Sequence, residues 1–316
     1  MTSVSPTTKP KPPDTILRID TEPVTIPGGW RGAVAVRLHR SQGERALADV
    51  DDWQTALRAF LEDPLALDDA ATLKYSSGAE VIRGLLACGP QRLDVVAKHH
   101  TPCGFSGRLS TMVSGAHAQR NFDRAVSLLA TGVNTAVPLA WIQCDRGKRE
   151  SWLLTSFAPE LVDLDHIALS LLPQRDAGAA HRIKQRMIHA VAAMFRALIE
   201  GGWHHRDLKA SNVLLQHWDA PDDAVAAWIV DLDGLSHRGK RSRNETQRLV
   251  RLAASLRSYV SITRTDYVRF LKAYRGVDRA VGDWRGEFRT LAREAEHYVT
   301  RSTRRKSHKI DGYDGD

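Results

Sequence analysis

The feature that most constrains this chain is the eight-residue segment His205–Asn212, with the sequence HRDLKASN. It matches the pattern H-R-D-L-x-x-x-N at every specified position. Apolar residues at helical spacing between residues 180 and 200 predict a long amphipathic helix before it, and the apolar run Val213–Leu215 predicts a strand after it. Since the pattern requires this order of helix, loop and strand, the segment is more than an isolated surface turn.

Three side chains of this segment have the chemistry needed to transfer a phosphoryl group. Asp207 can accept the proton of an acceptor hydroxyl, and Asn212, five residues later, can turn back to hold a magnesium ion on the phosphates. Lys209 brings positive charge to a group whose negative charge is spread over three oxygens. We therefore predict Asp207 and Lys209 as catalytic residues and Asn212 as a metal ligand. His205 and Arg206 are expected to hold the loop in shape.

A second polar segment begins nineteen residues after Asn212. The apolar run Ala227–Val230 predicts a strand, and the sequence DLDG follows it directly. A carboxylate at the end of such a strand is expected to supply the second ligand of a magnesium ion. We predict Asp231 as this ligand because it directly follows the strand, and Asp233 is the alternative.

Upstream, the strand-like run Val95–Ala97 ends at Lys98, which is predicted to contact the phosphates of a nucleotide. A solvated lysine at the end of a strand is the alternative interpretation. The turn at Ser77 and Gly78 is predicted to cover the phosphates, although no G-x-G-x-x-G pattern accompanies it.

The distribution of apolar residues predicts an α+β fold of two lobes. Residues 71–158 contain five predicted strands and one helix, which should end at Gly132 because glycine favours the position after a helix. Helical periodicity then dominates, at 180–200, 245–257, 265–275 and 284–298. This is the bilobal layout of a protein-kinase-like fold, with a β-rich N-lobe carrying one main helix and a mainly helical C-lobe.

The expected boundaries divide the chain into five parts. They are a disordered tail at 1–14, an extension without an assigned role at 15–66, the N-lobe at 67–158, the C-lobe at 159–300 and a flexible tail at 301–316.

Composition and charge restrict the surroundings and partners of the chain. The formal net charge is +8, which suits an anionic partner such as a nucleotide or an anionic lipid. The three cysteines form no C-x-x-C pair, so a reducing, cytoplasmic location is expected. The N-terminus has no apolar signal segment, and the apolar stretch Met187–Ile199 is too short to cross a bilayer. Any membrane contact is expected from the surface, at the inner membrane face.

The chain resembles the lipopolysaccharide kinase family of the Kdo/WaaP type, within the protein-kinase-like superfamily, over about residues 71–275. Besides HRDLKASN, the resemblance rests on Lys98, on the run GVNTAVPLA at 132–140, on DLD at 231–233, and on RLVRL at 248–252 with FLKAY at 270–274. It implies ATP and Mg²⁺ as cofactors. It also implies a sugar hydroxyl of lipopolysaccharide, or of a related glycolipid, as the acceptor.

One residue departs from the pattern of kinases. A glutamate on the first helix of a kinase pairs with the strand lysine, and here Asn121 occupies the expected position. The Lys98 contact is then weaker, or another acid replaces the glutamate. A pseudokinase, which binds nucleotide without transferring phosphate, is therefore an alternative.

The segment 235–244 that follows DLDG is short and offers little surface for a peptide substrate, and the A-P-E motif of protein kinases is absent. Its basic residues, with two more on the next predicted helix, are expected to dock an anionic glycolipid or membrane face, unless they form an ordinary solvated surface. They are Arg238, Lys240, Arg241 and Arg243, followed by Arg248 and Arg251.

Two further alternatives concern the function. A small-molecule phosphotransferase of the aminoglycoside or choline kinase type would share the catalytic Asp and Asn. A nucleic-acid-binding protein is suggested by net charge alone, because no signature of such a protein is present. The sequence does not predict the oligomeric state.

Overall fold

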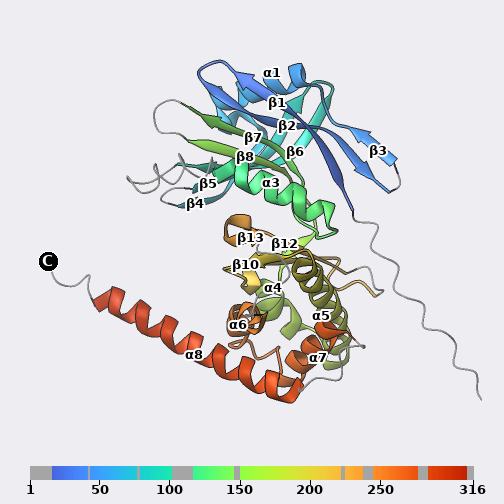
Figure 1. Ribbon diagram of the computed structural model, residues 1–316, viewed down its shortest axis with the longest axis vertical. Helices are drawn as coiled ribbons and strands as arrows, with labels where there is room; N and C mark the ends of the chain where they lie inside the picture. Colours follow the sequence, from blue (N-terminus) through green and yellow to red (C-terminus); the bar gives the residue numbers. More distant parts are fainter. Residues whose placement is uncertain are drawn as a thin grey trace, which may run out of the picture.

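The computed structural model describes residues 16–41, 43–76, 79–101, 117–145, 150–221, 225–237, 245–276 and 284–311. These residues form a β-rich N-terminal lobe and a mainly helical C-terminal lobe, which lie one above the other in Figure 1. The α+β class and the two-lobed layout predicted from the sequence are confirmed.

The N-lobe is built on one antiparallel sheet with the strand order β1-β2-β7-β8-β6-β5-β4, and β3 pairs with β2. The strands are β1 (Arg18–Ile26), β2 (Trp30–Arg40), β3 (Gly43–Ala46), β4 (Asp68–Ser76), β5 (Ala79–Cys88), β6 (Gln91–His100), β7 (Pro138–Cys144) and β8 (Ser151–Ser156). Where the sequence predicts five strands between residues 71 and 158, the sheet thus continues into β1–β3. These come from the segment that the sequence sets apart as an extension.

Two helices cover the faces of this sheet. Helix α1 (Val50–Glu62) packs on the outer face, where Trp53, Leu57 and Phe60 share one buried apolar cluster with residues of β1, β2, β5, β6, β7 and β8. The indole nitrogen Nε1 of Trp53 donates a hydrogen bond to the backbone oxygen of Ala35, at 3.0 Å. Helix α3 (His117–Ala130) covers the other face and lies between the sheet and the C-lobe (Figure 1).

The pairing of β2 with β7 joins residues that lie more than a hundred positions apart, such as Gly32 and Ile142. A side chain at Gly32 would place its Cβ 1.8 Å from the backbone oxygen of Trp141. Only glycine therefore allows the two strands to approach this closely.

The C-lobe is assembled around the long helix α5 (Ala177–Glu200). Its other helices are α4 (Leu164–His166), α6 (Glu245–Leu256), α7 (Arg264–Arg275) and α8 (Trp284–Asp311). Its short strands form two sheets. One has the order β12 (Ala226–Ile229), β11 (Val213–Gln216) and β9 (Leu161–Asp163), and the other pairs β10 (Trp203–His205) with β13 (Leu235–His237). Residues 301–311, assigned to a tail from the sequence, continue α8.

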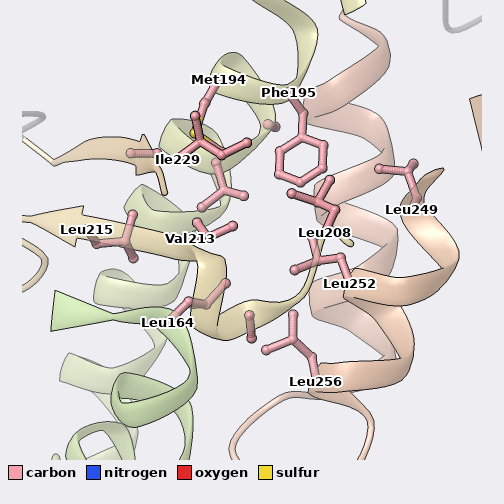
Figure 2. Close-up of a cluster of buried hydrophobic side chains, with 14 of the residues drawn as sticks. Leu164, Met194, Phe195, Leu208, Val213, Leu215, Ile229, Leu249, Leu252 and Leu256 are labelled. Carbon is pink, nitrogen blue, oxygen red and sulfur yellow. The ribbon is translucent and has the colours of Figure 1, made fainter. Parts of the chain in front are cut away.

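A buried apolar cluster fixes the segment between β10 and β11. Figure 2 shows Leu208 and Val213 inside this cluster, with Met194 and Phe195 of α5 on one side and α6 residues on the other. The loop that carries Asp207 is therefore held at both ends by burial of its own apolar residues.

The segment after α3 ties the two lobes together. The helix ends as predicted at Gly132, which has a φ of +77°. The chain then runs along β12, where the hydroxyl of Thr135 donates to the backbone oxygen of Ile229 at 2.8 Å. The backbone oxygen of Asn134 accepts from the nitrogen of Ile229 at 2.9 Å.

A buried ion pair joins α5 to α7. Lys184 Nζ lies 2.8 Å from Asp266 Oδ2, and the Asp266 side chain is only 4% exposed. Asp266 also completes a capping box with Thr263 at the start of α7. Burial opposes ionisation of Asp266, but its bonds to Lys184 and Thr263 outweigh it and lower the pKa of this carboxyl.

Removing the Asp266 carboxylate should strongly destabilise the C-lobe. Asp266→Ala leaves the Lys184 charge unpaired and should lower the free energy of unfolding by about 3 kcal/mol. Thr263→Ala removes the cap but keeps the ion pair, and should cost about 1 kcal/mol. Chemical denaturation at neutral pH measures both values, and equal losses in the two variants would contradict the importance of the ion pair.

Candidate active site

Two loops of the C-lobe lie side by side beneath α3. The first, with the HRDLKASN sequence, connects β10 to β11, and the second, with the DLDG sequence, connects β12 to β13. Because β11 pairs with β12 and β10 pairs with β13, the two loops are joined by strand pairing on both sides. Val213 faces Ile229, and His205 faces Leu235.

The His205 ring joins the two loops through hydrogen bonds to the backbone of each. Its Nδ1 accepts from the backbone nitrogen of Asp207 at 3.2 Å, so its Nε2 carries the proton and donates to the backbone oxygen of Asp231 at 2.9 Å. Burial lowers the pKa of His205 and keeps the ring neutral, as this tautomer requires. Gly234 packs on the ring, since an added Cβ would lie 3.0 Å from His205 Cε1.

Asp231 adopts a left-handed backbone conformation, with φ 61° and ψ 61°. This conformation is costly for residues other than glycine and persists where the surrounding structure enforces it, often at functional sites. Here it points the carbonyl at His205, and the carboxylate remains 42% exposed. The strain therefore coincides with a carboxylate that is available to a ligand.

The amide nitrogen of Asn212 is hydrogen-bonded, whereas its amide oxygen accepts no hydrogen bond from the residues that the structure describes. Nδ2 donates to the backbone oxygen of Asp207 at 2.9 Å, and the backbone oxygen of Asn212 accepts from Val230 at 3.0 Å. Asn212 and Asp231 thus offer an amide oxygen and a carboxylate from adjacent segments, which are donors that magnesium prefers. Among the described residues, no group of three His, Cys, Asp or Glu forms a cage. Magnesium on phosphates does not need one, because phosphate and water oxygens complete its shell.

Lys98 of β6 reaches down from the sheet to both acids of the second loop. Its Nζ lies 3.1 Å from Asp233 Oδ2 and 3.5 Å from Asp231 Oδ1. The predicted phosphate-binding lysine and the predicted metal ligand are therefore brought together from opposite lobes.

Asp233 supplies the negative charge beside Lys98 that Asn121 cannot supply. Its Oδ1 accepts from Nδ2 of Asn121 on α3, while its Oδ2 faces Lys98. His117 Nδ1 also lies 3.3 Å from Oδ1. An acid of the second loop thus bridges the lysine and the helix, in the place where kinases use a helix glutamate. The sequence named Asp233 only as an alternative metal ligand.

The surroundings of Asp233 favour its ionised form. Burial alone would raise the pKa of Asp233, but the charges of Lys98 and His117 and the hydrogen bond from Asn121 outweigh it and lower the pKa to about 2. Arg124 of α3 closes the group, donating to Asn121 Oδ1 at 3.0 Å and to the backbone oxygen of Leu232 at 2.9 Å.

Asp207 faces two basic side chains. Lys209 Nζ lies 3.9 Å from its Oδ2, and Nη1 of Arg251 on α6 donates to its Oδ1. The sequence predicted Lys209 beside Asp207, but it placed Arg251 only with the basic residues expected to dock an anionic partner, because α6 follows the loop by some forty residues. Ser77 and Gly78, and the basic residues Arg238, Lys240, Arg241 and Arg243, lie outside the described residues.

The charge of Asp233 should stabilise the folded protein in a pH-dependent way. The drop in its pKa from 3.8 to about 2 corresponds to about 2 kcal/mol. Because the folded-state pKa is depressed, this contribution is present above about pH 4 and is lost as the pH falls towards 2.

Asp233→Asn should therefore lower the free energy of unfolding by about 2 kcal/mol at pH 7, with a loss that shrinks below about pH 4. Denaturant unfolding at a series of pH values measures this difference. Asp231→Asn, at a more exposed carboxylate, is the control and should have the smaller effect. A pH-independent loss in Asp233→Asn would count against the ion pair.

Comparisons with known proteins place this chain in a family. Residues 108–274 match the model of the "Lipopolysaccharide kinase (Kdo/WaaP) family". The chain is 27% identical over 199 residues to the "Lipopolysaccharide core heptose(I) kinase WaaP" of Pseudomonas aeruginosa, covering 61% of this chain and 72% of that protein.

A solved structure described as "WaaP in complex with acyl carrier protein" shares the fold. Its TM-score is 0.56 at 23% identity, over 80% of this chain and 98% of that one. The kinase-like part of the fold prediction is thereby confirmed, as is the resemblance found in the sequence. The family match spans more than half of the chain, so this protein belongs to the lipopolysaccharide kinase (Kdo/WaaP) family and is a kinase.

Proposed function

We propose that this kinase transfers the γ-phosphoryl group of ATP to a hydroxyl of a lipopolysaccharide sugar or of a related glycolipid. The observation that carries the proposal is the meeting of Lys98 with Asp231, beside the loop that holds Asp207 and Asn212. These groups come from a strand of the N-lobe and two loops of the C-lobe, so only the folded chain assembles them.

Lys98 and the two metal ligands account for nucleotide binding. Lys98 is proposed to give up its contact with Asp231 and bind phosphate oxygens instead. Its ion pair with Asp233 would remain. Asn212 Oδ1 and the Asp231 carboxylate would hold Mg²⁺, which neutralises charge on the phosphate oxygens when bound.

Asp207 is the proposed base, and Lys209 the proposed electrostatic partner of the transferring group. The proton of the acceptor hydroxyl passes to a carboxylate oxygen of Asp207, the new bond forms between the hydroxyl oxygen and the γ-phosphorus, and ADP leaves. Asp207 is 45% exposed, which leaves room for a hydroxyl to approach.

The saccharide acceptor is supported by the relatives. The name of the Pseudomonas relative assigns it the core heptose(I) of lipopolysaccharide, and the net charge of +8 suits an anionic glycolipid. The family match favours this acceptor over a small molecule of the aminoglycoside or choline type. The intact set of Asp207, Asn212 and Asp231 counts against a pseudokinase, and Asp233 removes the objection that Asn121 raised.

The place of the reaction belongs to the same proposal. Within the part of the chain that the structure describes, no helix is both long and apolar enough to cross a membrane. We propose a cytoplasmic kinase that meets its acceptor at the inner membrane face through basic residues, among them the predicted cluster at 238–243.

The base of the nucleotide is proposed to lie under Arg83. Val81 pairs with Lys98 and Arg83 pairs with Val96, so Arg83 and Lys98 project from the same face of the sheet. Both Arg83 nitrogens Nε and Nη2 donate to Asp94, at 3.1 and 2.8 Å. The guanidinium carbon lies 3.4 Å from the ring centroid of Phe157, in the connection between the lobes. A planar cation fixed there can stack on a nucleobase whose phosphates reach Lys98.

Replacing Asp207, the proposed catalytic base, should strongly impair phosphoryl transfer and spare nucleotide binding. Asp207→Asn should lower transfer at least about a hundredfold, because the acceptor proton loses its carboxylate. The assay combines labelled ATP, magnesium and extracted envelope glycolipids, with mass analysis of the product. Asp219→Ala, at an exposed carboxylate of the C-lobe paired with Arg175, is the matched control. Equal turnover in the wild type and in Asp207→Asn would refute the proposed role.

Replacing Arg83 should weaken binding of the nucleobase of ATP and leave binding of its phosphates unchanged. Arg83→Leu should weaken ATP binding about tenfold, since the stacking surface is lost, and leave the binding of inorganic tripolyphosphate unchanged. Calorimetric titration of both ligands with magnesium measures this contrast. Arg92→Ala removes an exposed arginine of the neighbouring strand, paired with Asp68, and should change neither affinity. An equal loss for both ligands would contradict base stacking.

A further inference from the structure

Arg251 is a C-lobe residue that reaches the proposed catalytic base. Its Nη1 donates to Asp207 Oδ1, and the two side chains are 35% and 45% exposed. The hydrogen bond is charge-assisted and ties one of the two carboxylate oxygens to a helix. The other oxygen, Oδ2, faces Lys209 at 3.9 Å.

The same helix holds the loop at a second point. Ser255 Oγ accepts from the backbone nitrogen of Ala210 at 2.9 Å and donates to the backbone oxygen of Leu252 at 2.8 Å. Arg251 and Ser255 lie one turn apart, so they share a face of α6. This face therefore grips the catalytic loop through both a side chain and the backbone.

Helix α8 packs against α6. Tyr298 of α8 receives the Arg251 guanidinium over its ring, at 5.2 Å from the centroid. Arg257 Nη2, just beyond α6, lies 3.1 Å from Glu296 Oε1 of α8. Leu291 and Ala295 of α8 are buried in the same core as the apolar residues of α6. Arg251 thus contacts both Tyr298 of α8 and Asp207 of the candidate active site.

We propose that Arg251 is a positioning residue for the reaction, and that Tyr298 of α8 helps to hold it. It fixes the Asp207 carboxylate by occupying Oδ1 and leaves Oδ2 to take the proton of the acceptor hydroxyl. Arginine suits this role because its guanidinium stays protonated. It donates a hydrogen bond to the Asp207 carboxylate but cannot transfer a proton to it in place of the acceptor hydroxyl. The inference rests on the proposed function of Asp207 as the base.

Arg251→Ala should lower kcat by about thirtyfold, because the carboxylate is then free to turn away from the acceptor. The KM for ATP should stay within about twofold of the wild type, since Lys98 and the metal ligands are untouched. Arg251→Lys keeps a charge at the end of a long side chain and should recover part of kcat. Tyr298→Leu should lower kcat by a smaller factor, about threefold.

Arg257→Ala is the matched control. It removes an arginine that also links the end of α6 to α8, but one that does not contact Asp207. Its kcat should stay within about twofold of the wild type. A loss in Arg257→Ala equal to that in Arg251→Ala, or full activity in Arg251→Ala, would overturn the inference.

A second measurement separates this inference from the proposed function. Thermal unfolding of Arg251→Ala, Asp207→Asn and the double variant reports the contact without any turnover. The loss of stability in the double variant should be smaller than the sum of the two single losses, since both changes remove the contact between Arg251 and Asp207. Additive losses would overturn the contact even in an active enzyme. An inactive wild type with non-additive losses would instead defeat the proposed function and leave the contact intact.

Discussion

The ion pair between Lys98 and Asp233 is the interaction on which the active site depends. Lys98 belongs to the sheet of the N-lobe, and Asp233 belongs to a loop of the C-lobe. The same carboxylate receives Asn121 from α3, so one acid connects a strand, a helix and a loop. Because ion pairs in partly buried sites are strong only when their geometry is satisfied, this contact favours an arrangement of the lobes that brings Lys98 to Asp233.

Local patterns in the sequence predicted the proposed catalytic loop because its elements are close along the chain. A helix, eight residues and a strand are all that define the position of Asp207 and Asn212, and burial of Leu208 anchors the loop in the folded chain. Helix α3 and its end at Gly132 were predictable for the same reason, since helical spacing and a glycine after the helix are local signals.

Contacts between distant segments could not be predicted in this way. The pairing of β2 with β7 depends on a close approach at Gly32 that no periodicity reveals. Arg251 lies on a helix predicted correctly, but nothing in that pattern shows which of its arginines faces Asp207. The substitution of Asp233 for the missing glutamate likewise appears only when the α3 helix and the second loop are seen together.

The pairing of β2 with β7 has a consequence for how the chain can be shortened. Strand β2 covers the edge of β7, and α1 covers the outer face of the sheet that carries Lys98. Excising them would leave a row of unbonded amides and a bare apolar surface, both of which invite association with other chains. A fragment trimmed to residues 71–275 would thus keep every proposed reactive group and lose the strands and the helix that shield its sheet from other chains.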